Sequence, residues 1–233
     1  MIGNKRLLGI IPARGGSKRL PRKNVIELGG KPLIAWTLES ALCSKYIDRI
    51  FVSTDDSEIA EISKNYGVGV PFMRPAELAT DHAQTIDTIL HVISELEKLK
   101  ETYDYVVLLQ PTSPLRTVED IEKSIEMLKE SKNDGIISVC EAEHHPLWSN
   151  TIPDDGSLSG FLDESILNKR GQDLGKYFRL NGAIYICKTT KLIEENTFFL
   201  KNNCKAFVMR QENSLDIDNQ IDLDFAKYRI LNI

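Results

Sequence analysis

Short apolar runs alternate along the chain with longer segments in which apolar residues recur every three or four positions. Continuous apolar runs are typical of strands inside a sheet, and the three-to-four spacing is typical of helices that cover one. The apolar runs predict strands at 6–13, 49–54, 103–110, 135–141, 182–188 and 205–211. The helical spacing predicts helices at 31–45, 55–67, 83–100, 117–132, 189–196 and 220–230.

This alternation of strand and helix predicts an α/β fold with a doubly wound, mostly parallel sheet and helices on both faces. Two helix starts carry a local signal. Asp55 and Glu58 have the spacing of a capping box, and Thr117 and Asp120 form a second possible cap. Gly67 follows the helix that begins at Asp55 and is expected to end it.

The alternation stops between residues 141 and 180, where the chain is polar and lacks a clean period. The stretch PDDGSLSG indicates turns, yet Trp148, Phe161, Leu162 and Ile166 are too apolar for a free linker. We interpret 141–180 as an inserted arm that packs on a partner subunit, most simply in a homodimer. Residues 1–140 and 181–233 then form the main domain.

Composition narrows the classes of function. The 233 residues carry a net charge of −5, which argues against a general nucleic-acid binder. No apolar run approaches the ~20 residues of a membrane-spanning helix, and no signal peptide is recognisable at the N-terminus. Four scattered cysteines without a CxxC pair indicate structural thiols and favour a cytoplasmic location.

A local basic cluster stands out against this acidic background. The stretch IIPARGGSKRLPRKN, from Ile10 to Asn24, places five cations around a Gly-Gly-Ser turn directly after the first predicted strand. Ligands of doubly wound sheets bind at that end of the strands, so the cluster predicts a triphosphate site. The spacing matches neither a Walker A loop nor GxGxxG, and the alternative interpretation is a solvated basic turn.

The stretch SLDIDNQID places Asp216 and Asp218 two residues apart, on one face of an extended segment. Two neighbouring carboxylates repel each other unless a cation joins them, and Mg²⁺ commonly uses one or two carboxylates together with substrate phosphates. The pair therefore predicts a Mg²⁺ site. The alternative is a polar strand edge followed by a helix that Asp218 or Asn219 caps.

Two further stretches offer neutral and basic groups at predicted strand ends. In LLQPTSPLR, Gln110 ends a central strand, and its amide suits sugar or base groups. In FRLNGAIYI, Arg179 and Asn181 precede a buried strand that contains Tyr185. The alternatives are a stiff strand-to-helix connection for the first stretch and a core position for Tyr185.

These motifs occur together with VSTDDSEIAEI and RPAELATD, and their order and spacing over residues 7–229 resemble the acylneuraminate cytidylyltransferases. The resemblance implies a Rossmann-like α/β domain with a small dimerisation arm. It also implies Mg²⁺-dependent joining of CTP to a nine-carbon 2-keto sugar acid of the neuraminate or legionaminate type, with release of pyrophosphate.

The resemblance also implies roles for individual residues. Arg14, Ser17 and Lys23 would hold the triphosphate, Asn24 would contact the nucleotide, and Arg74 would lie near the cytosine. The other implied contacts are to the metal and to the sugar acid. Asp216 and Asp218 would bind the metal, Gln110, Arg179, Asn181 and Tyr185 would contact the sugar, and Arg170, after a one-residue gap near Gly171, would meet the substrate carboxylate.

Four alternatives remain within or beside this family. The synthetases for the eight-carbon acid KDO have a different basic loop, from which Gly16 and Lys18 depart. Pseudaminate enzymes share most motifs, but RPAELATD resembles the other two nine-carbon classes more closely. A nucleotidyltransferase that uses another NTP and a sugar phosphate would share the fold. A non-catalytic nucleotide-sugar-binding protein would not need both Asp216 and Asp218.

Overall fold

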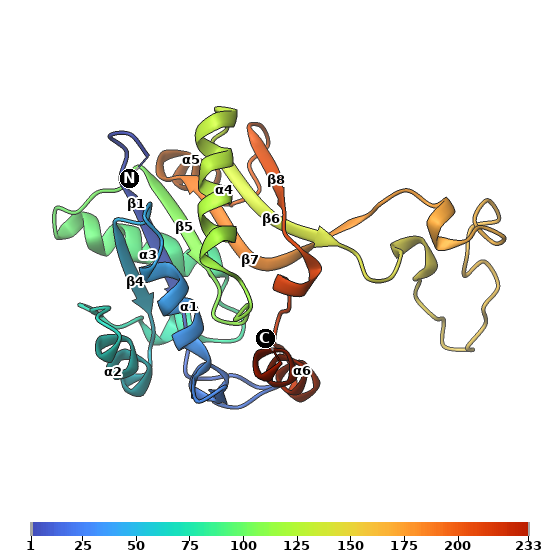
Figure 1. Ribbon diagram of the computed structural model, residues 1–233, viewed down its shortest axis with the longest axis horizontal. Helices are drawn as coiled ribbons and strands as arrows, with labels where there is room; N and C mark the ends of the chain where they lie inside the picture. Colours follow the sequence, from blue (N-terminus) through green and yellow to red (C-terminus); the bar gives the residue numbers. More distant parts are fainter. Residues whose placement is uncertain (1, 233) are drawn as a thin grey trace.

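The computed structural model describes residues 2–232 and builds them around one six-stranded sheet (Figure 1). The strand order is β4-β1-β5-β7-β6-β8. β7 runs antiparallel to both of its neighbours, and the remaining pairs are parallel. The strands are β1 Leu7–Pro12, β4 Arg49–Ser53, β5 Tyr105–Leu109, β6 Gly135–Glu141, β7 Phe178–Lys188 and β8 Cys204–Val208.

Helices cover both faces of this sheet, which confirms the predicted fold class. Apolar residues of α1, α2 and α4 pack in one cluster with residues of the sheet, and those of α3 and α5 pack in a second cluster on its other face (Figure 1). The helices are α1 Leu33–Leu42, α2 Ser57–Asn65, α3 Thr85–Lys98, α4 Val118–Ser131, α5 Thr189–Glu195 and α6 Gln220–Leu231. In residues 2–232, none of the helices is long and apolar enough to span a membrane.

The helix-start signals were partly right. Thr117 and Asp120 form the predicted capping box of α4, and Gly67 follows α2 with a φ of +83°. The cap of α2 is Asp56 rather than Asp55, because the Asp56 side chain accepts hydrogen bonds from the backbone of Glu58 and Ile59. Asp55 is therefore free to bind a different part of the chain.

β7 begins at Phe178, four residues earlier than predicted, so Arg179 and Asn181 lie within the strand rather than before it. Its pairing with β6 is interrupted, because Ile137 faces Tyr185 whereas Val139 faces Leu180. The extra residues of β7 form a bulge that contains Gly182, whose φ is +71°. Bulges of this kind redirect the chain and often lie beside active sites.

The break in the sequence pattern corresponds to a long excursion between β6 and β7. Residues 142–177 extend away from the sheet and contain only two short 3-10 turns, Pro146–Trp148 and Gly171–Asp173 (Figure 1). Of the apolar residues expected to pack, Ile166 is buried, whereas Trp148 is 40% exposed. Other large apolar side chains of the excursion are also exposed, namely Leu147, Ile152, Leu158 and Leu167.

A third apolar cluster fixes the C-terminal segment next to the basic loop. It joins Leu20 of that loop to the small hairpin β2 Glu27–Leu28 and β3 Lys31–Pro32, to Ile217 and to α6. Ile217 is fully buried in this cluster. Since side chains alternate along an extended segment, Asp216 and Asp218 project on the opposite side from Ile217.

Candidate active site

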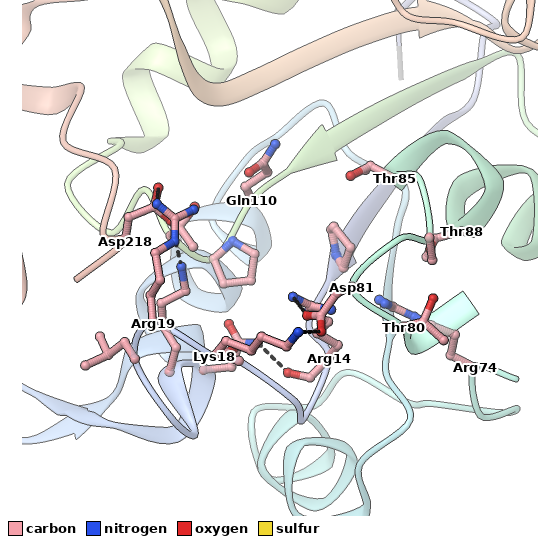
Figure 2. Close-up of a pocket in the computed structure, with 18 of the residues that line it drawn as sticks. Arg14, Lys18, Arg19, Arg74, Thr80, Asp81, Thr85, Thr88, Gln110 and Asp218 are labelled. Carbon is pink, nitrogen blue, oxygen red and sulfur yellow. Dashed lines mark hydrogen bonds and ion pairs between the residues drawn. The ribbon is translucent and has the colours of Figure 1, made fainter. Parts of the chain in front are cut away.

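A cavity of about 490 Å³ opens where β1 and β5 end, at the edge of the sheet predicted to bind the ligand. Four parts of the chain line it: the basic loop, the segment between Arg74 and Thr88, the end of β5, and Asp218 (Figure 2). The predicted site residues among its walls are Arg14, Ser17, Lys23, Asn24, Arg74, Gln110 and Asp218.

The carboxylates that follow β4 shape the basic loop from behind. Asp55 accepts a 3.0 Å hydrogen bond from the backbone nitrogen of Gly15. A Cβ at Gly15 would lie only 2.6 Å from Oδ2 of Asp56, so this position requires glycine. Asp56 also pairs with Arg22, which has a left-handed φ of +57°. The sequence reasoning missed these anchoring roles, although the neighbouring acids after a strand were a usable signal.

Asn24 joins the two ends of the basic loop from its buried side. It is 7% exposed, and its Nδ2 donates a 2.9 Å hydrogen bond to the carbonyl oxygen of Arg14. The side chain lines the cavity as expected for a nucleotide contact. Its hydrogen bond also fixes the direction in which the backbone leaves β1, so Asn24 holds the loop in shape.

Two carboxylates bind the cations of the loop. Nη2 of Arg14 and Nζ of Lys18 lie 2.9 and 2.7 Å from the two carboxylate oxygens of Asp81. Nζ of Lys23 and Nη1 of Arg19 lie 3.2 and 3.1 Å from Asp218. The cavity is therefore lined by cations whose charge is balanced internally, and a bound anion must compete with these carboxylates.

Lys23 is the most firmly held of these cations. Its side chain is 14% exposed, and Nζ donates a 2.7 Å hydrogen bond to the carbonyl oxygen of Ile217 as well as contacting Asp218. This contact joins the start of the chain to its last extended segment. A rigid, mostly buried ammonium at a cavity wall can offset phosphate charge without a large reorganisation.

Asp216 and Asp218 flank Ile217, whose backbone nitrogen donates a 2.8 Å hydrogen bond to the Thr112 carbonyl oxygen. Oδ1 of Asp216 is buried and has no hydrogen-bond partner within residues 2–232. Burial raises the pKa of the Asp216 carboxyl, the Thr112 hydroxyl partly opposes that rise, and the nearby charge of Asp218 adds to it. An unpartnered buried carboxylate oxygen is costly, and a cation would remove this cost.

Gln110 and the bulge of β7 lie beside Asp216. A Cβ at Gly182 would lie 3.7 Å from both Oδ2 of Asp216 and Oε1 of Gln110. The bulge is stabilised from behind by Asn181, which is 1% exposed. Oδ1 of Asn181 accepts a 2.6 Å hydrogen bond from Ser138. The structure thus places Asn181 beneath the bulge of β7 rather than at a surface open to a ligand.

A buried arginine that the sequence reasoning did not single out supports the same region. Arg116 is 3% exposed and donates hydrogen bonds to the carbonyl oxygens of Gln110 and Ala183, at 3.1 and 2.8 Å. It donates a third, of 2.8 Å, to the Thr37 hydroxyl. Burial lowers the pKa of Arg116 to about 9. Arg116 therefore joins the end of β5 to the middle of β7 beneath the cavity.

Arg74 lines the opposite wall of the cavity. It is 7% exposed, and its guanidinium donates 3.0 and 2.6 Å hydrogen bonds to the side chain and the backbone carbonyl oxygen of Ser53. Burial lowers its pKa to about 10. Because Ser53 ends β4, these bonds tie the 74–88 segment to the sheet.

Asp216 and Asn181 do not line the cavity, and the remaining predicted residues also lie outside its walls. Tyr185 is half-buried, with its ring 5.7 Å from that of Phe198. Burial raises the Tyr185 pKa, and the Asp216 charge adds to that rise. Arg179 pairs with Glu143 at the base of the arm and lowers the Glu143 pKa to about 2. Arg170 lies far along the arm and pairs with Asp173 at 3.0 Å. This chain alone does not bring Arg170 to the cavity.

Comparisons with known proteins agree with this geometry. A family model described as Cytidylyltransferase matches residues 8–227. The CMP-N,N'-diacetyllegionaminic acid synthase of Legionella pneumophila is 37% identical, with 93% of each chain covered. A pseudaminic acid cytidylyltransferase of Campylobacter jejuni is 36% identical, with 94% of each chain covered.

Two further proteins, one found by sequence and one by structure, are also similar to this chain. The N-acylneuraminate cytidylyltransferase of Streptococcus agalactiae serotype V is 38% identical over 91% of this chain and 50% of its own. A CMP-2-keto-3-deoxy-manno-octonic acid synthetase solved with CTP has the same fold, with a TM-score of 0.70 at 18% identity over 97% of this chain and 99% of that one. The chain, an enzyme of the nucleotidyltransferase class, therefore belongs to the cytidylyltransferase family.

Proposed function

We propose that this cytidylyltransferase joins CTP to a nine-carbon 2-keto sugar acid of the neuraminate or legionaminate type. The observation that carries the proposal is the cavity of clustered cations beside the buried Asp216, whose Oδ1 has no hydrogen-bond partner within residues 2–232. Relatives named for legionaminic, pseudaminic and neuraminic acids, each at least 36% identical, support the nine-carbon class. The KDO enzyme, at 18% identity, shares the fold alone.

In the proposed reaction, the anomeric 2-hydroxyl oxygen of the sugar acid forms a bond to the α-phosphorus of CTP. The bond from that phosphorus to the bridging oxygen breaks, and pyrophosphate leaves with the electron pair. The hydroxyl proton passes to solvent. Chemistry of this kind depends mainly on positioning and on neutralising charge. Arg14, Ser17 and Lys23 would bind the triphosphate, with the two cations offsetting the growing negative charge.

Asp216 and Asp218 fit a hard divalent cation such as Mg²⁺. Both offer carboxylate oxygens, and the orphaned Oδ1 of Asp216 is a ready ligand. Within residues 2–232, His, Cys, Asp and Glu side chains form no cluster of three or more that could hold a metal without the substrate. We therefore expect phosphate oxygens to complete the coordination. A bound Mg²⁺ would polarise phosphate oxygens and lower the pKa of the attacking hydroxyl.

The nucleoside and the sugar would occupy opposite sides of the phosphates. Arg74 and Asn24 line the wall on which we place the cytosine. Gln110, Tyr185 and Arg179 lie toward the bulge of β7, where we place the sugar acid, with Asn181 supporting the bulge. Arg170 lies on the arm, so it would meet the sugar carboxylate only through the arm of a second copy. This is one reason to propose a homodimer.

The direct test is pyrophosphate release in the presence of Mg²⁺. CTP, UTP, GTP and ATP are each offered with N-acetylneuraminate, legionaminate, pseudaminate and KDO. We expect release with CTP and a neuraminate- or legionaminate-type acid. Release only with KDO, or with a sugar phosphate and another NTP, would contradict the proposal. CTP binding without release for any acid would favour a nucleotide-sugar-binding protein.

Pseudaminate remains the second candidate substrate because of one specific finding. The pseudaminic acid cytidylyltransferase of C. jejuni is 36% identical to this chain, against 37% for the legionaminic acid enzyme, at nearly the same coverage. Overall sequence identity therefore does not support the preference for neuraminate or legionaminate over pseudaminate that RPAELATD suggested. The same assay separates the acids by their relative kcat/KM.

A further inference from the structure

Asp81 occupies the part of the cavity where the loop cations converge. Figure 2 shows its carboxylate between Arg14 and Lys18, facing the cavity from the segment that carries Arg74. One carboxylate oxygen lies 2.9 Å from Nη2 of Arg14, and the other lies 2.7 Å from Nζ of Lys18. Both oxygens are thus engaged by cations of the opposite wall.

A ligand phosphate group could take the place of the Asp81 carboxylate between Arg14 and Lys18. A guanidinium and an ammonium that share two oxygens of one anion suit phosphate as well as carboxylate. Asp81 therefore acts as an internal anion in the free protein, and a ligand phosphate reaches Arg14 and Lys18 only by replacing it. A carboxylate carries a single negative charge, whereas pyrophosphate or a nucleoside triphosphate carries roughly three or four near neutral pH.

The segment around Asp81 can release this contact at little cost to the fold. Its neighbouring hydrogen bonds are short-range: Ala83 donates from its backbone to Thr80, and the Thr80 hydroxyl donates to the Glu77 carbonyl oxygen. Asp81 is exposed, as are Thr80 and His82 beside it. The two ion pairs are the long-range polar contacts that the structure records for Asp81.

We propose that Asp81 is a specificity-determining residue that competes with ligand anions for Arg14 and Lys18. It excludes anions of low charge from the empty site and yields to the triphosphate of the nucleotide. It also returns to the two cations as pyrophosphate leaves. This inference rests on the proposed function, in which these cations bind the triphosphate.

Isothermal titration calorimetry tests the inference with CTP, pyrophosphate and inorganic phosphate as probes. Asp81→Asn keeps the shape of the side chain and removes the competing charge. Exposed ion pairs are individually weak, so we expect the Kd for pyrophosphate and CTP to fall about three- to tenfold. The Kd for inorganic phosphate should fall by at least as large a factor. All of these increases in affinity should become smaller at high salt.

Two controls isolate the role of Asp81. Asp87→Asn removes one exposed negative charge from the first turn of α3, outside the cavity walls, and should leave each Kd within twofold. Asp81→Glu keeps the carboxylate and should resemble the wild type. An Asp81→Asn protein that binds these anions no tighter than the wild type, or an Asp81→Glu protein that binds them as tightly as Asp81→Asn, overturns the inference.

The wild-type titration separates this inference from the proposed function. If the wild type binds neither CTP nor pyrophosphate, the assignment of the cavity fails and the role of Asp81 fails with it. If the wild type binds both and Asp81→Asn shows no gain, only the role of Asp81 fails. A melting curve for each variant verifies that every protein titrated is folded.

Discussion

Nζ of Lys23 lies 3.2 Å from Oδ1 of Asp218, although 195 positions separate the two residues in the chain. The same nitrogen donates a 2.7 Å hydrogen bond to the Ile217 carbonyl oxygen. The basic loop after the first strand and the acidic pair before the last helix therefore form one site. Neither half of this site is complete without the other, because the cation orients the carboxylate that we expect to bind the metal.

Lys23→Ala should lower kcat by about 100- to 1,000-fold, because removing one preorganised charge-stabilising group typically has that effect. The protein should remain folded, since within residues 2–232 the ammonium makes only two polar contacts. Steady-state kinetics of pyrophosphate release measures the loss. Lys64→Ala, an exposed lysine near the end of α2, is the matched control and should keep normal turnover. Near-normal turnover in Lys23→Ala would remove Lys23 from the catalytic set.

Asp216→Asn should abolish at least about 99% of turnover, because it removes a proposed metal ligand. The loss should persist at high Mg²⁺ if the carboxylate charge itself is required. Asp224→Asn, on the exposed side of α6, is the control and should stay active. An Asp216→Asn enzyme whose turnover and Mg²⁺ dependence match the wild type would contradict the metal assignment.

Asp216→Asn should also change how the stability of the folded protein depends on pH. Burial raises the Asp216 pKa above its ordinary value of 3.8, so the folded protein binds this proton more tightly than the unfolded chain does. The stabilisation from that proton is fully present below pH 3.8 and is lost as the pH rises through the raised value. Ligand-free Asp216→Asn should therefore have a higher Tm than the wild type at pH 7. The difference should shrink toward pH 4 in differential scanning calorimetry.

The fold was largely predictable because it depends on local periodicity. Each predicted strand and helix of the main domain is present, since apolar runs and three-to-four spacing are imposed by burial on a sheet. Strand boundaries were less predictable. β7 starts early because its bulge is supported by a long-range hydrogen bond from Ser138 to Asn181, which no local pattern reveals.

The site was predictable where its residues follow strands and carry charge. Arg14, Lys23 and Asp218 come together as the positions of their motifs suggested. Asp81 and Arg116 were missed because their roles depend on partners distant in the sequence. Asn181 was expected to contact a ligand, but its amide is buried. The sequence could not show this, because an Asn in a motif looks the same whether it faces a ligand or a bulge.

The arm should mediate dimer formation, because large apolar side chains on an extended excursion are costly to leave in water. Leu147 and Trp148 are 41% and 40% exposed in the single chain. Sedimentation velocity should show a dimer for the wild type and a shift toward monomer for Leu147→Ser/Trp148→Ser. Ile193→Ser, an exposed apolar residue on α5, is the control and should remain dimeric. A monomeric wild type at micromolar concentration would contradict the proposed arm contact.

Arg116→Met should destabilise the protein by about 2–4 kcal/mol, because it removes the side-chain donor of the buried Ala183 carbonyl oxygen and one of the donors to the Gln110 carbonyl oxygen. Thr37→Val removes the hydroxyl that accepts the third hydrogen bond and should cost about 1 kcal/mol. Urea unfolding measures both.

Since Arg116 joins β5 to β7 beneath Gln110, we also expect Arg116→Lys to restore part of the stability but to raise KM for the sugar acid more than KM for CTP. Equal changes in both KM values would mean that Arg116 supports the fold without positioning the sugar side of the site.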